Sequence, residues 1–341
     1  MDIFNTAVLN RVIDALPNPS SFLLDVGFRQ EQTETSEEIH FDVESNKPRI
    51  TPFVHPTRAG KVIQDQGFRT DSFRPAYAKD KREFDPGKPL KRAIGEQIGG
   101  NLSPEQRMQI AIRRSLADQL SMLGRREAVM AAQALTLGKV TVSGDGYPTK
   151  VVDFGRHPSL TVALAGGSQW GDAGVSIVGS LEDWAGDIQA QSGALGTTVI
   201  MDPRAWRLAH TDDAFMKLFE SRRGSESTAE TGPISRGYAG ARNVGFVGDF
   251  DIWVYQDTYV DENDVTQQMI PDNTVVMLDP INLEGTRCYG AIRDPKAGYQ
   301  ARRFFSKSWD DEDPAVRWLL LQSAPLVVPY RVNASFAATV A

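Results

Sequence analysis

Cysteine is almost absent from this 341-residue chain, which contains only Cys288. No disulfide can therefore form within it, as is usual for proteins folded in a reducing compartment. Cys288 stands in the apolar run GTRCYGAI. A lone cysteine in such a run more often fills space in a core than acts as a nucleophile. We therefore expect packing, and not covalent cross-linking, to hold the fold together.

The sequence also lacks a long apolar run and a secretory leader. No stretch approaches the roughly 20 apolar residues that a membrane-spanning helix needs. The opening MDIFNTAVLNRVIDAL carries Asp2 where a signal peptide has positive charge, and Arg11 and Asp14 interrupt its apolar residues. We expect no membrane contact and folding in a cytoplasm.

An excess of basic charge is missing as well. The chain has 44 acidic and 37 basic residues, a net charge of -7, which argues against wrapping nucleic acid specifically. Apolar residues make up 41% of the chain and charged residues 24%, as in ordinary folded proteins.

Motifs for catalysis, cofactors and metals are also lacking, so we expect no catalytic, cofactor-binding or metal site and no enzyme. The histidines are too dispersed to form a metal site: His40, His55, His157 and His210. SGDGYP lacks the third glycine of a dinucleotide loop, and no Walker loop occurs. AGGSQWG places Trp170 where a nucleophile elbow has its second glycine. A hydrolase that uses Ser168 or Cys288 is kept as the enzyme alternative, and the acidic DDEDP is interpreted as a solvated turn.

One long amphipathic helix is the clearest feature that is present. Ser103 is a good N-cap, Pro104 suits the first helical position, and Gln106 completes a capping box. An apolar stripe at steps of three and four predicts a buried face, broken once by Glu127. Gly138 ends the helix. The stripe consists of Ile112, Leu116, Leu120, Leu123, Met130, Ala134 and Leu137.

The first hundred residues contain little pattern that builds a core. Residues 2–16 predict a short helix with Phe4, Val8, Val12 and Leu16 on one face, ended by Pro17 and Pro19. The apolar segment SFLLDVGF is too short for a core of its own and should dock elsewhere. Residues 29–101 suggest an arm followed by a two-stranded excursion, which is marginal alone in water. It therefore needs a partner surface, within the chain or from another chain, and its scattered aromatics are the candidate assembly contacts with that surface: Phe68, Phe73, Tyr77 and Phe84.

After the long helix the pattern becomes mixed. KVTVSGDGYPTKVVDFG predicts a hairpin around Gly144-Asp145-Gly146. Ser180 is expected to cap a helix that runs to about Gln191. GTTVIMD is expected to form a buried strand, and Asp202-Pro203 is expected to start another helix. Several strands follow, and PAVRWLLLQSAPLVVPY predicts two strands separated by Pro325. The fold class is therefore α+β.

These pieces, in this order, resemble the family of major capsid proteins that includes the head protein of phage lambda. The resemblance rests on TAVLNRVIDALPNPSSFLLDVGF, VESNKPRITPFVHPTRAGKVIQDQGFRTDSFRPAYAK, LTLGKVTVSGDGYPTKVVDFGR, VIMDPRAWRLAH, ESRRGS, PDNTVVMLD, TRCYGAIRD and WDDEDPAVRWLLLQSAPLVVP. It implies a Hong Kong 97-like fold and a shell subunit of a tailed bacteriophage.

The same resemblance implies a domain map. It assigns residues 1–45 to an N-terminal arm, 46–101 to an extended E-loop, and 102–164 to a P domain with the spine helix and hairpin. Residues 165–300 would form an A domain around hexamer and pentamer axes, and 301–341 would return to the P domain.

Partners follow from this map as expectations. The arm motif begins within ten residues of Met1, so we expect a separate scaffolding protein and no long cleaved propeptide. Other expected partners are copies of the chain, a portal protein and packaged DNA; a decoration protein is left open. Some relatives join subunits by a lysine–asparagine bond, but nothing marks a catalytic glutamate for Lys61, Lys79, Lys81, Lys88 or Lys91. An encapsulin-type nanocompartment shell is the alternative function.

Overall fold

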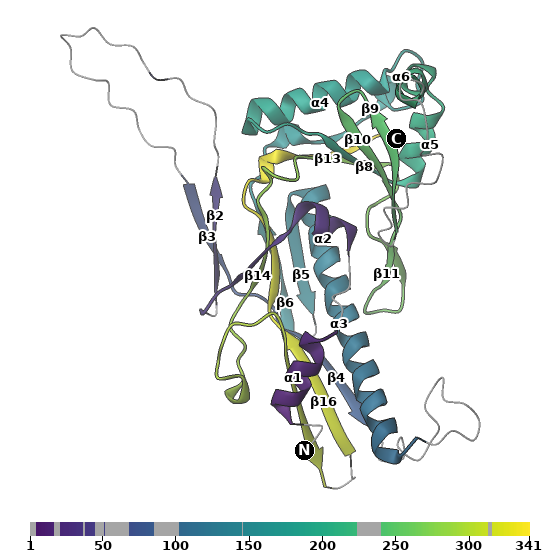
Figure 1. Ribbon diagram of the computed structural model, residues 1–341. Helices are drawn as coiled ribbons and strands as arrows, with labels where there is room; N and C mark the ends of the chain where they lie inside the picture. Colours follow the sequence, from purple (N-terminus) through teal and green to yellow (C-terminus); the bar gives the residue numbers. More distant parts are fainter. Residues whose placement is uncertain are drawn as a thin grey trace, which may run out of the picture.

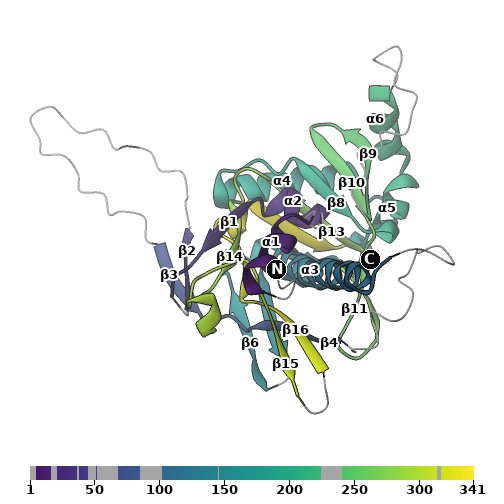
Figure 2. The same ribbon diagram turned by 60° about the horizontal axis from the view of Figure 1, so that its bottom comes forward.

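The long helix determines the shape of the molecule. The computed structural model describes residues 5–16, 21–36, 38–44, 51, 68–84, 102–144, 146–223, 240–312 and 316–341. Figure 1 shows α3 (Pro104–Leu137) running along the length of the molecule, and Figure 2 looks closer to its axis. One group of elements surrounds the C-terminal half of α3 and another its N-terminal half; we call these the upper and lower parts.

The predicted ends of α3 are confirmed. The Ser103 hydroxyl accepts from the backbone N–H of Gln106, whose side chain accepts from the backbone of Ser103. At the other end Gly138 has φ +67°, a left-handed conformation that favours glycine. The Arg156 guanidinium donates to the carbonyls of Leu135 and Thr136, so the last turn is satisfied by a charged side chain.

A six-stranded sheet forms the centre of the upper part. Its central strands are largely apolar, as expected where both faces are covered. Figure 1 shows helices α4, α5 and α6 on the far side of this sheet from α3. The sheet order is β7 (Thr161–Ala163), β18 (Ser335–Thr339), β13 (Thr274–Leu278), β8 (Thr198–Met201), β10 (Phe250–Tyr255) and β9 (Ala241–Val247). The helices are α4 (Ile177–Ser192), α5 (Pro203–His210) and α6 (Asp213–Arg223).

Asp202 caps α5 as predicted, whereas the predicted start of α4 is wrong. Ser176, not Ser180, is the N-cap of α4, and its hydroxyl accepts from the N–H of Gly179. Ser180 lies inside the first turn and donates to the carbonyl of Ser176. Both serines suit a helix start, and the burial of Ile177 sets the start one turn earlier.

The lower part is a three-stranded antiparallel sheet against α3 and α1 (Thr6–Asp14). The sheet order is β15 (Phe305–Asp311), β16 (Val316–Ser323) and β4 (Ala78–Phe84). Leu9 and Ile13 of α1 are buried beside Leu319 and Leu321 of β16. The expected apolar face of α1 was thus displaced by one residue, because Val8 and Val12 are only partly buried.

The N-terminal helix therefore contributes to a core of its own chain. The Asn10 side-chain oxygen accepts from the Ser306 N–H at 3.0 Å, and its amide donates back to the Ser306 carbonyl. An edge strand exposes such groups for pairing. On β15 the Asn10 side chain hydrogen-bonds both the N–H and the carbonyl of Ser306, so these two edge groups are already paired.

Smaller pairs complete the fold. β1 (Gln30–Thr33), β14 (Gly285–Tyr289) and β17 (Pro325–Pro329) form a sheet in that order, with β1 parallel to β14. α2 (Phe22–Gly27) docks on α3, as expected for SFLLDVGF. The two-stranded pairs are β2 (Ile39–Glu44) with β3 (Phe68–Phe73), β5 (Lys139–Gly144) with β6 (Tyr147–Asp153), and β11 (Thr258–Val260) with β12 (Thr266–Gln268). β5 and β6 are the strands of the predicted hairpin, and Asp145 in its turn lies outside the described residues.

Sheet pairing changes the expected domain boundaries. β4 lies within the 46–101 segment but pairs with β16, so this part of the expected loop belongs to the lower part. β18 lies within the 301–341 segment but pairs with β13 and β7 in the upper sheet. The C-terminal segment thus returns to the lower part through β15 and β16 and ends in the upper part. The remainder of 46–101, apart from residues 51 and 68–84, lies outside the described residues.

Candidate assembly surfaces

The buried face of α3 passes from one hydrophobic core to another. Ile112, Leu116, Leu120 and Leu123 belong to the lower core, and Met130 and Ala134 belong to the upper core. All six are buried, whereas Leu137 at the helix end is half-exposed. Between the two groups lies Glu127, the break in the predicted stripe, which is itself 0% exposed.

Glu127 is held by groups from two other segments. Its carboxylate lies 3.3 Å from Nη2 of Arg303 and accepts from the Tyr289 hydroxyl at 3.1 Å. Arg303 also lies 3.4 Å from the carboxylate of Glu31, and Arg287 lies 3.0 Å from the Glu31 carboxylate as well. We call Glu31, Glu127, Arg287, Tyr289 and Arg303 the charged junction. It connects α3, β1, β14 and the segment before β15.

Burial and neighbouring opposite charges shift the pKa values of Glu127 and Arg303 in opposite directions. Burial raises the pKa of Glu127, and Arg303 only partly offsets this. Burial alone would lower the pKa of Arg303, but Glu127, Tyr289 and Glu31 together outweigh it and the net direction is upward. Burial and the Glu127 charge together raise the pKa of Tyr289, so its hydroxyl stays a donor at neutral pH. The junction ties α3 to β1, β14 and the segment before β15.

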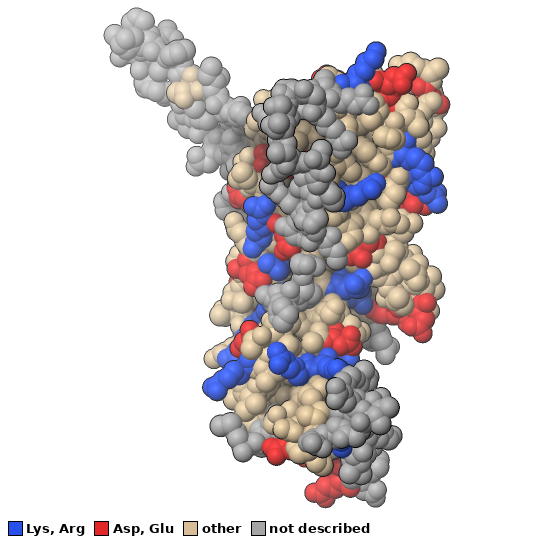
Figure 3. All heavy atoms as spheres, turned by 45° about the vertical axis from the view of Figure 1, so that its right-hand side comes forward, with Lys and Arg blue, Asp and Glu red and all other residues tan. Residues whose placement is uncertain are grey.

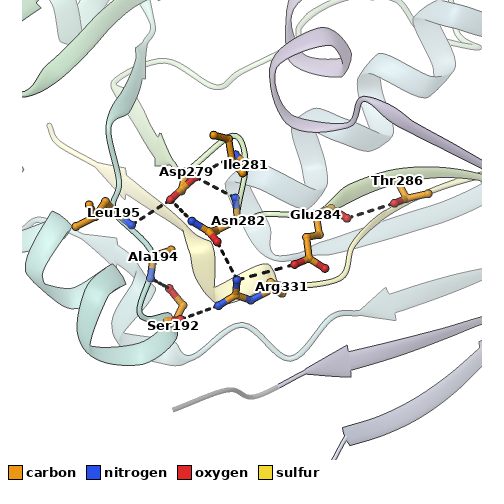
Figure 4. A network of polar contacts seen from close by, with 9 residues as sticks. All are labelled: Ser192, Ala194, Leu195, Asp279, Ile281, Asn282, Glu284, Thr286 and Arg331. Carbon is orange, nitrogen blue, oxygen red and sulfur yellow. Dashed lines mark hydrogen bonds and ion pairs between the residues drawn. The ribbon is translucent and has the colours of Figure 1, made fainter. Parts of the chain in front are cut away.

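A second buried network fixes two loops at the end of α4 (Figure 4). Asp279 accepts from the backbone N–H groups of Leu195, Ile281 and Asn282, at 3.1, 3.0 and 3.0 Å. The Asn282 side chain also donates to Asp279 and accepts from Arg331. Burial alone would raise the pKa of Asp279, but these donors outweigh it and hold the pKa below its ordinary value. The network gives the 194–196 and 279–284 loops a fixed conformation.

The four aromatics expected as assembly contacts are not equivalent. Phe73 and Phe84 are buried within the chain itself, Phe73 in the upper core and Phe84 in the lower core. Tyr77 is half-buried, and its hydroxyl donates to the Ala291 carbonyl at 2.7 Å. Phe73 and Phe84 therefore need no neighbouring subunit for their burial. Both residues are brought into a core by pairing between segments that are distant in sequence. β4, which carries Phe84, pairs with β16 beside α3, and β3, which ends at Phe73, pairs with β2. The side chain of Phe68 lies outside the described residues.

The lysines considered for a covalent bond between subunits also differ from one another. Lys81 lies over the Trp318 ring, 3.6 Å from its centroid, and Lys79 lies 5.4 Å from that of Tyr77. Such contacts stabilise a cation on an aromatic face. Lys61, Lys88 and Lys91 lie outside the described residues.

The nucleophiles of the hydrolase alternative lack an activating partner among the described residues. Cys288 is fully buried, and burial raises its pKa to about 12, which keeps the thiol protonated. The Ser168 hydroxyl donates to the Ala165 carbonyl at 2.9 Å. In DDEDP, Asp310 pairs with Arg317 and Asp311 accepts from the Trp318 ring nitrogen. No group of three acidic, histidine or cysteine side chains is arranged for a metal in the described segments.

The charged surface shows no single dominant sign where it can be seen. On the face drawn in Figure 3, lysine and arginine are interspersed with aspartate and glutamate. Of the helices described, none is both long and apolar enough to cross a bilayer.

Comparison with solved structures defines the class. The chain matches a prophage capsid protein of Escherichia coli CFT073 with a TM-score of 0.75 at 22% identity, covering 99% of both chains. It matches the capsid of Ralstonia phage GP4 with a TM-score of 0.55 at 11% identity, covering 95% of this chain and 91% of the other. The fold is thus the Hong Kong 97-like fold of phage capsid proteins.

Sequence comparison gives the family. The model of phage major capsid protein E matches residues 5–340. The chain is 30% identical over 332 residues to the major capsid protein of Escherichia phage lambda, covering 96% of each. The chain belongs to the phage major capsid protein E family. This membership confirms the resemblance noted in the sequence and favours a phage head over the encapsulin alternative.

Proposed function

We propose that this protein assembles as hexamers and pentamers into the icosahedral head of a tailed bacteriophage and encloses double-stranded DNA. The observation that supports this most directly is the family match over nearly the whole chain, 5–340. The role is structural and not enzymatic. The subunit has its place in the virion, after assembly in the cytoplasm of the host bacterium.

The parts of the subunit suggest separate roles in the shell. The upper part, with the six-stranded sheet, corresponds to an A domain around the capsomer axes. The lower part, with α3 and the β15–β16–β4 sheet, corresponds to a P domain. The segment between β2 and β3 extends over a neighbour as an E-loop. Figure 1 shows the β2–β3 pair directed away from the body of the molecule, which suits such a role.

Other proteins are needed to control this assembly. Subunits that contact one another through several surfaces can close at more than one curvature, so a separate scaffolding protein selects the correct one. A portal protein occupies one vertex, and DNA contacts the shell without sequence preference. Expressed alone, the protein should give aberrant particles, tubes or aggregates, with correctly sized shells in the minority.

Electron microscopy of the expressed full-length chain tests the proposal. A shell protein gives curved sheets, tubes or closed particles that sediment far ahead of a small oligomer. A population consisting only of monomers or small oligomers, with and without a co-expressed scaffolding protein, would contradict the assignment.

The loop between β2 and β3 can be tested separately. Deletion of Phe68–Phe84 is unsuitable, because it would remove β4 from the lower sheet. Glu44 and Phe68 form the last pair of the β2–β3 ladder, so residues 45–67 can be replaced by Asn-Gly, which suits a two-residue hairpin turn. We expect a folded subunit that no longer forms stable shells. Intact shells from this variant would refute a bridging role for the loop.

A further inference from the structure

The hairpin formed by β11 and β12 carries an acidic and partly apolar tip on one flank of α3. Its segment 257–268 contains four acidic residues and no lysine or arginine. Val260 is 60% exposed and Val265 is 49% exposed. Figure 3 shows this side of the molecule, with acidic side chains at the outer end of the hairpin. Two exposed valines beside acidic side chains are suited to a contact with another protein.

The tip is fixed in position. Asp261 accepts from the backbone N–H groups of Asn263 and Val265, both at 2.9 Å, and these bonds hold the pKa of its carboxyl below the usual value. Arg125 and Arg126 of α3 tie the hairpin to the helix through Asp257 and Glu262. Asp264 makes no ion pair with any described residue and is exposed.

A loop of the opposite character lies on the other flank. Residues 292–303, IRDPKAGYQARR, contain four basic residues and one acid, Asp294. Asp294 is buried, forms an ion pair with Lys307 and accepts a hydrogen bond from the Gln322 side chain. Lys296 and Arg302 are exposed and make no ion pair with the described carboxylates.

Tyr299 lies at the outer end of this loop. It is 62% exposed and has φ +56°. Bulky side chains rarely adopt this backbone region, and such strain tends to occur at functional positions. Behind Tyr299, a small core of Ile292, Ala297 and Phe305 and the Ala291–Ala301 bridge hold the loop rigidly.

The hairpin and the loop cannot meet within one subunit. Figures 1 and 2 both show β11 on one side of α3 and the loop after β14 on the other. Two different surfaces on opposite flanks produce a head-to-tail contact, which closes into a ring or sheet when copies repeat it. Complementary charge favours this pairing and disfavours the contact of like surfaces.

We propose that the β11–β12 tip of one subunit docks on the 292–302 loop of the next copy, with Val260 and Val265 against Tyr299 and Asp264 facing Lys296 and Arg302. This inference rests on the proposed shell function and specifies one of its subunit contacts.

Disulfide trapping tests the contact directly. Because Cys288 is buried, cysteines introduced at exposed positions are the only accessible thiols among the described residues. Val265→Cys combined with Tyr299→Cys should, after oxidation of assembled particles, give a ladder of dimers, trimers and higher multimers on a non-reducing gel. Each single variant should stay monomeric, as should Val265→Cys combined with Leu137→Cys, a half-exposed control position.

Charge reversal provides an independent readout. Asp264→Lys and Lys296→Glu should each lower the yield of sedimenting particles by about tenfold, because like charges would then face one another. The two changes in one chain should restore the yield to within about twofold of wild type, since every contact again has opposite charges. The neutral variant Asp264→Asn serves as the matched control and should retain most of the yield.

The outcomes separate the contact from the shell function. If the wild-type chain forms no particles, the proposed function fails. If wild-type particles form but the double cysteine variant gives only monomers, the inference fails and the shell function stands. Should the cysteine variants not assemble, the reversal pair decides: an unrestored double reversal overturns the contact, and restoration supports it.

Discussion

Replacing Glu127 by leucine would remove the only carboxylate buried between the two cores of α3 among the described residues and leave Arg303 poorly paired. Arg303 is 12% exposed on its side chain, and its remaining partner, Glu31, is 42% exposed and 3.4 Å away. Arg303→Met would have the converse effect and leave Glu127, which is fully buried, without its ion-pair partner. Both variants isolate a charge in a poorly solvated place.

The expected magnitude follows from this burial. Removal of one partner from a buried ion pair typically costs about 3–5 kcal/mol. We expect the low end for Glu127→Leu, because Glu31 still neutralises Arg303 in part. We expect the high end for Arg303→Met, because only the Tyr289 hydroxyl remains at the Glu127 carboxylate. A typical domain has about 5–15 kcal/mol of stability, so either change should be easily detected.

The double variant distinguishes an ion pair from simple packing. With both charges replaced by apolar side chains, only the Tyr289 hydroxyl loses its acceptor. The double variant should therefore be more stable than the two separate losses predict, by an interaction term of about 2 kcal/mol. Urea unfolding of the unassembled full-length subunit, followed by circular dichroism, gives the three free energies.

Two results would refute this reasoning. If each single variant changes the free energy of unfolding by less than about 1 kcal/mol, the junction is not desolvated as described. If the losses in the double variant simply add, Glu127 and Arg303 are not coupled.

Three further predictions concern other parts of the chain. Leu116→Asp should abolish soluble protein, because an unpaired buried charge costs several kcal/mol, whereas Met122→Asp on the exposed side of α3 should remain soluble in a fractionation assay. Arg156→Ala should lower the free energy of unfolding in urea by about 2–3 kcal/mol, because the carbonyls of Leu135 and Thr136 lose a charged donor; equal stability would contradict the clamp. Asp279 has a lowered pKa in the fold, so its stabilisation is present above its ordinary value of 3.8 and is lost as the pH falls through its folded pKa. The stability difference between wild type and Asp279→Asn should therefore be largest near neutral pH and shrink in acid; a constant difference would rule out the charge effect.

Local signals predicted local structure well. The capping box at Ser103, the glycine at the end of α3, the 139–153 hairpin and the Asp202 cap each depend on residues a few positions apart. The strand from GTTVIMD was also identifiable, because an unbroken apolar run requires cover on both faces. These features follow from periodicity and capping chemistry, which act over one or two turns.

The charged junction could not be predicted, because its members are far apart in the chain. Glu127 appeared to interrupt an apolar stripe, and its partner Arg303 follows 176 residues later. Phe84 similarly appeared isolated because β16, which pairs with β4, lies near the C-terminus. Wide spacing in sequence therefore said nothing about burial. One available signal was the position of Glu127 on the buried side of a long helix, where a carboxylate needs a partner.

The lower core has a consequence for the order in which the chain is made. Leu9, Ile112 and Leu116 emerge from the ribosome long before Leu319 and Leu321, which complete their packing. About 200 residues separate the end of this stretch of α3 from β16, which corresponds to roughly 10–40 s of synthesis at about 5–20 residues per second. During that time the apolar faces of α1 and α3 have no sheet to cover them. A nascent chain thus cannot present a finished lower part to its neighbours, and assembly of truncated chains into the shell is disfavoured. The same interval leaves these faces available to chaperones.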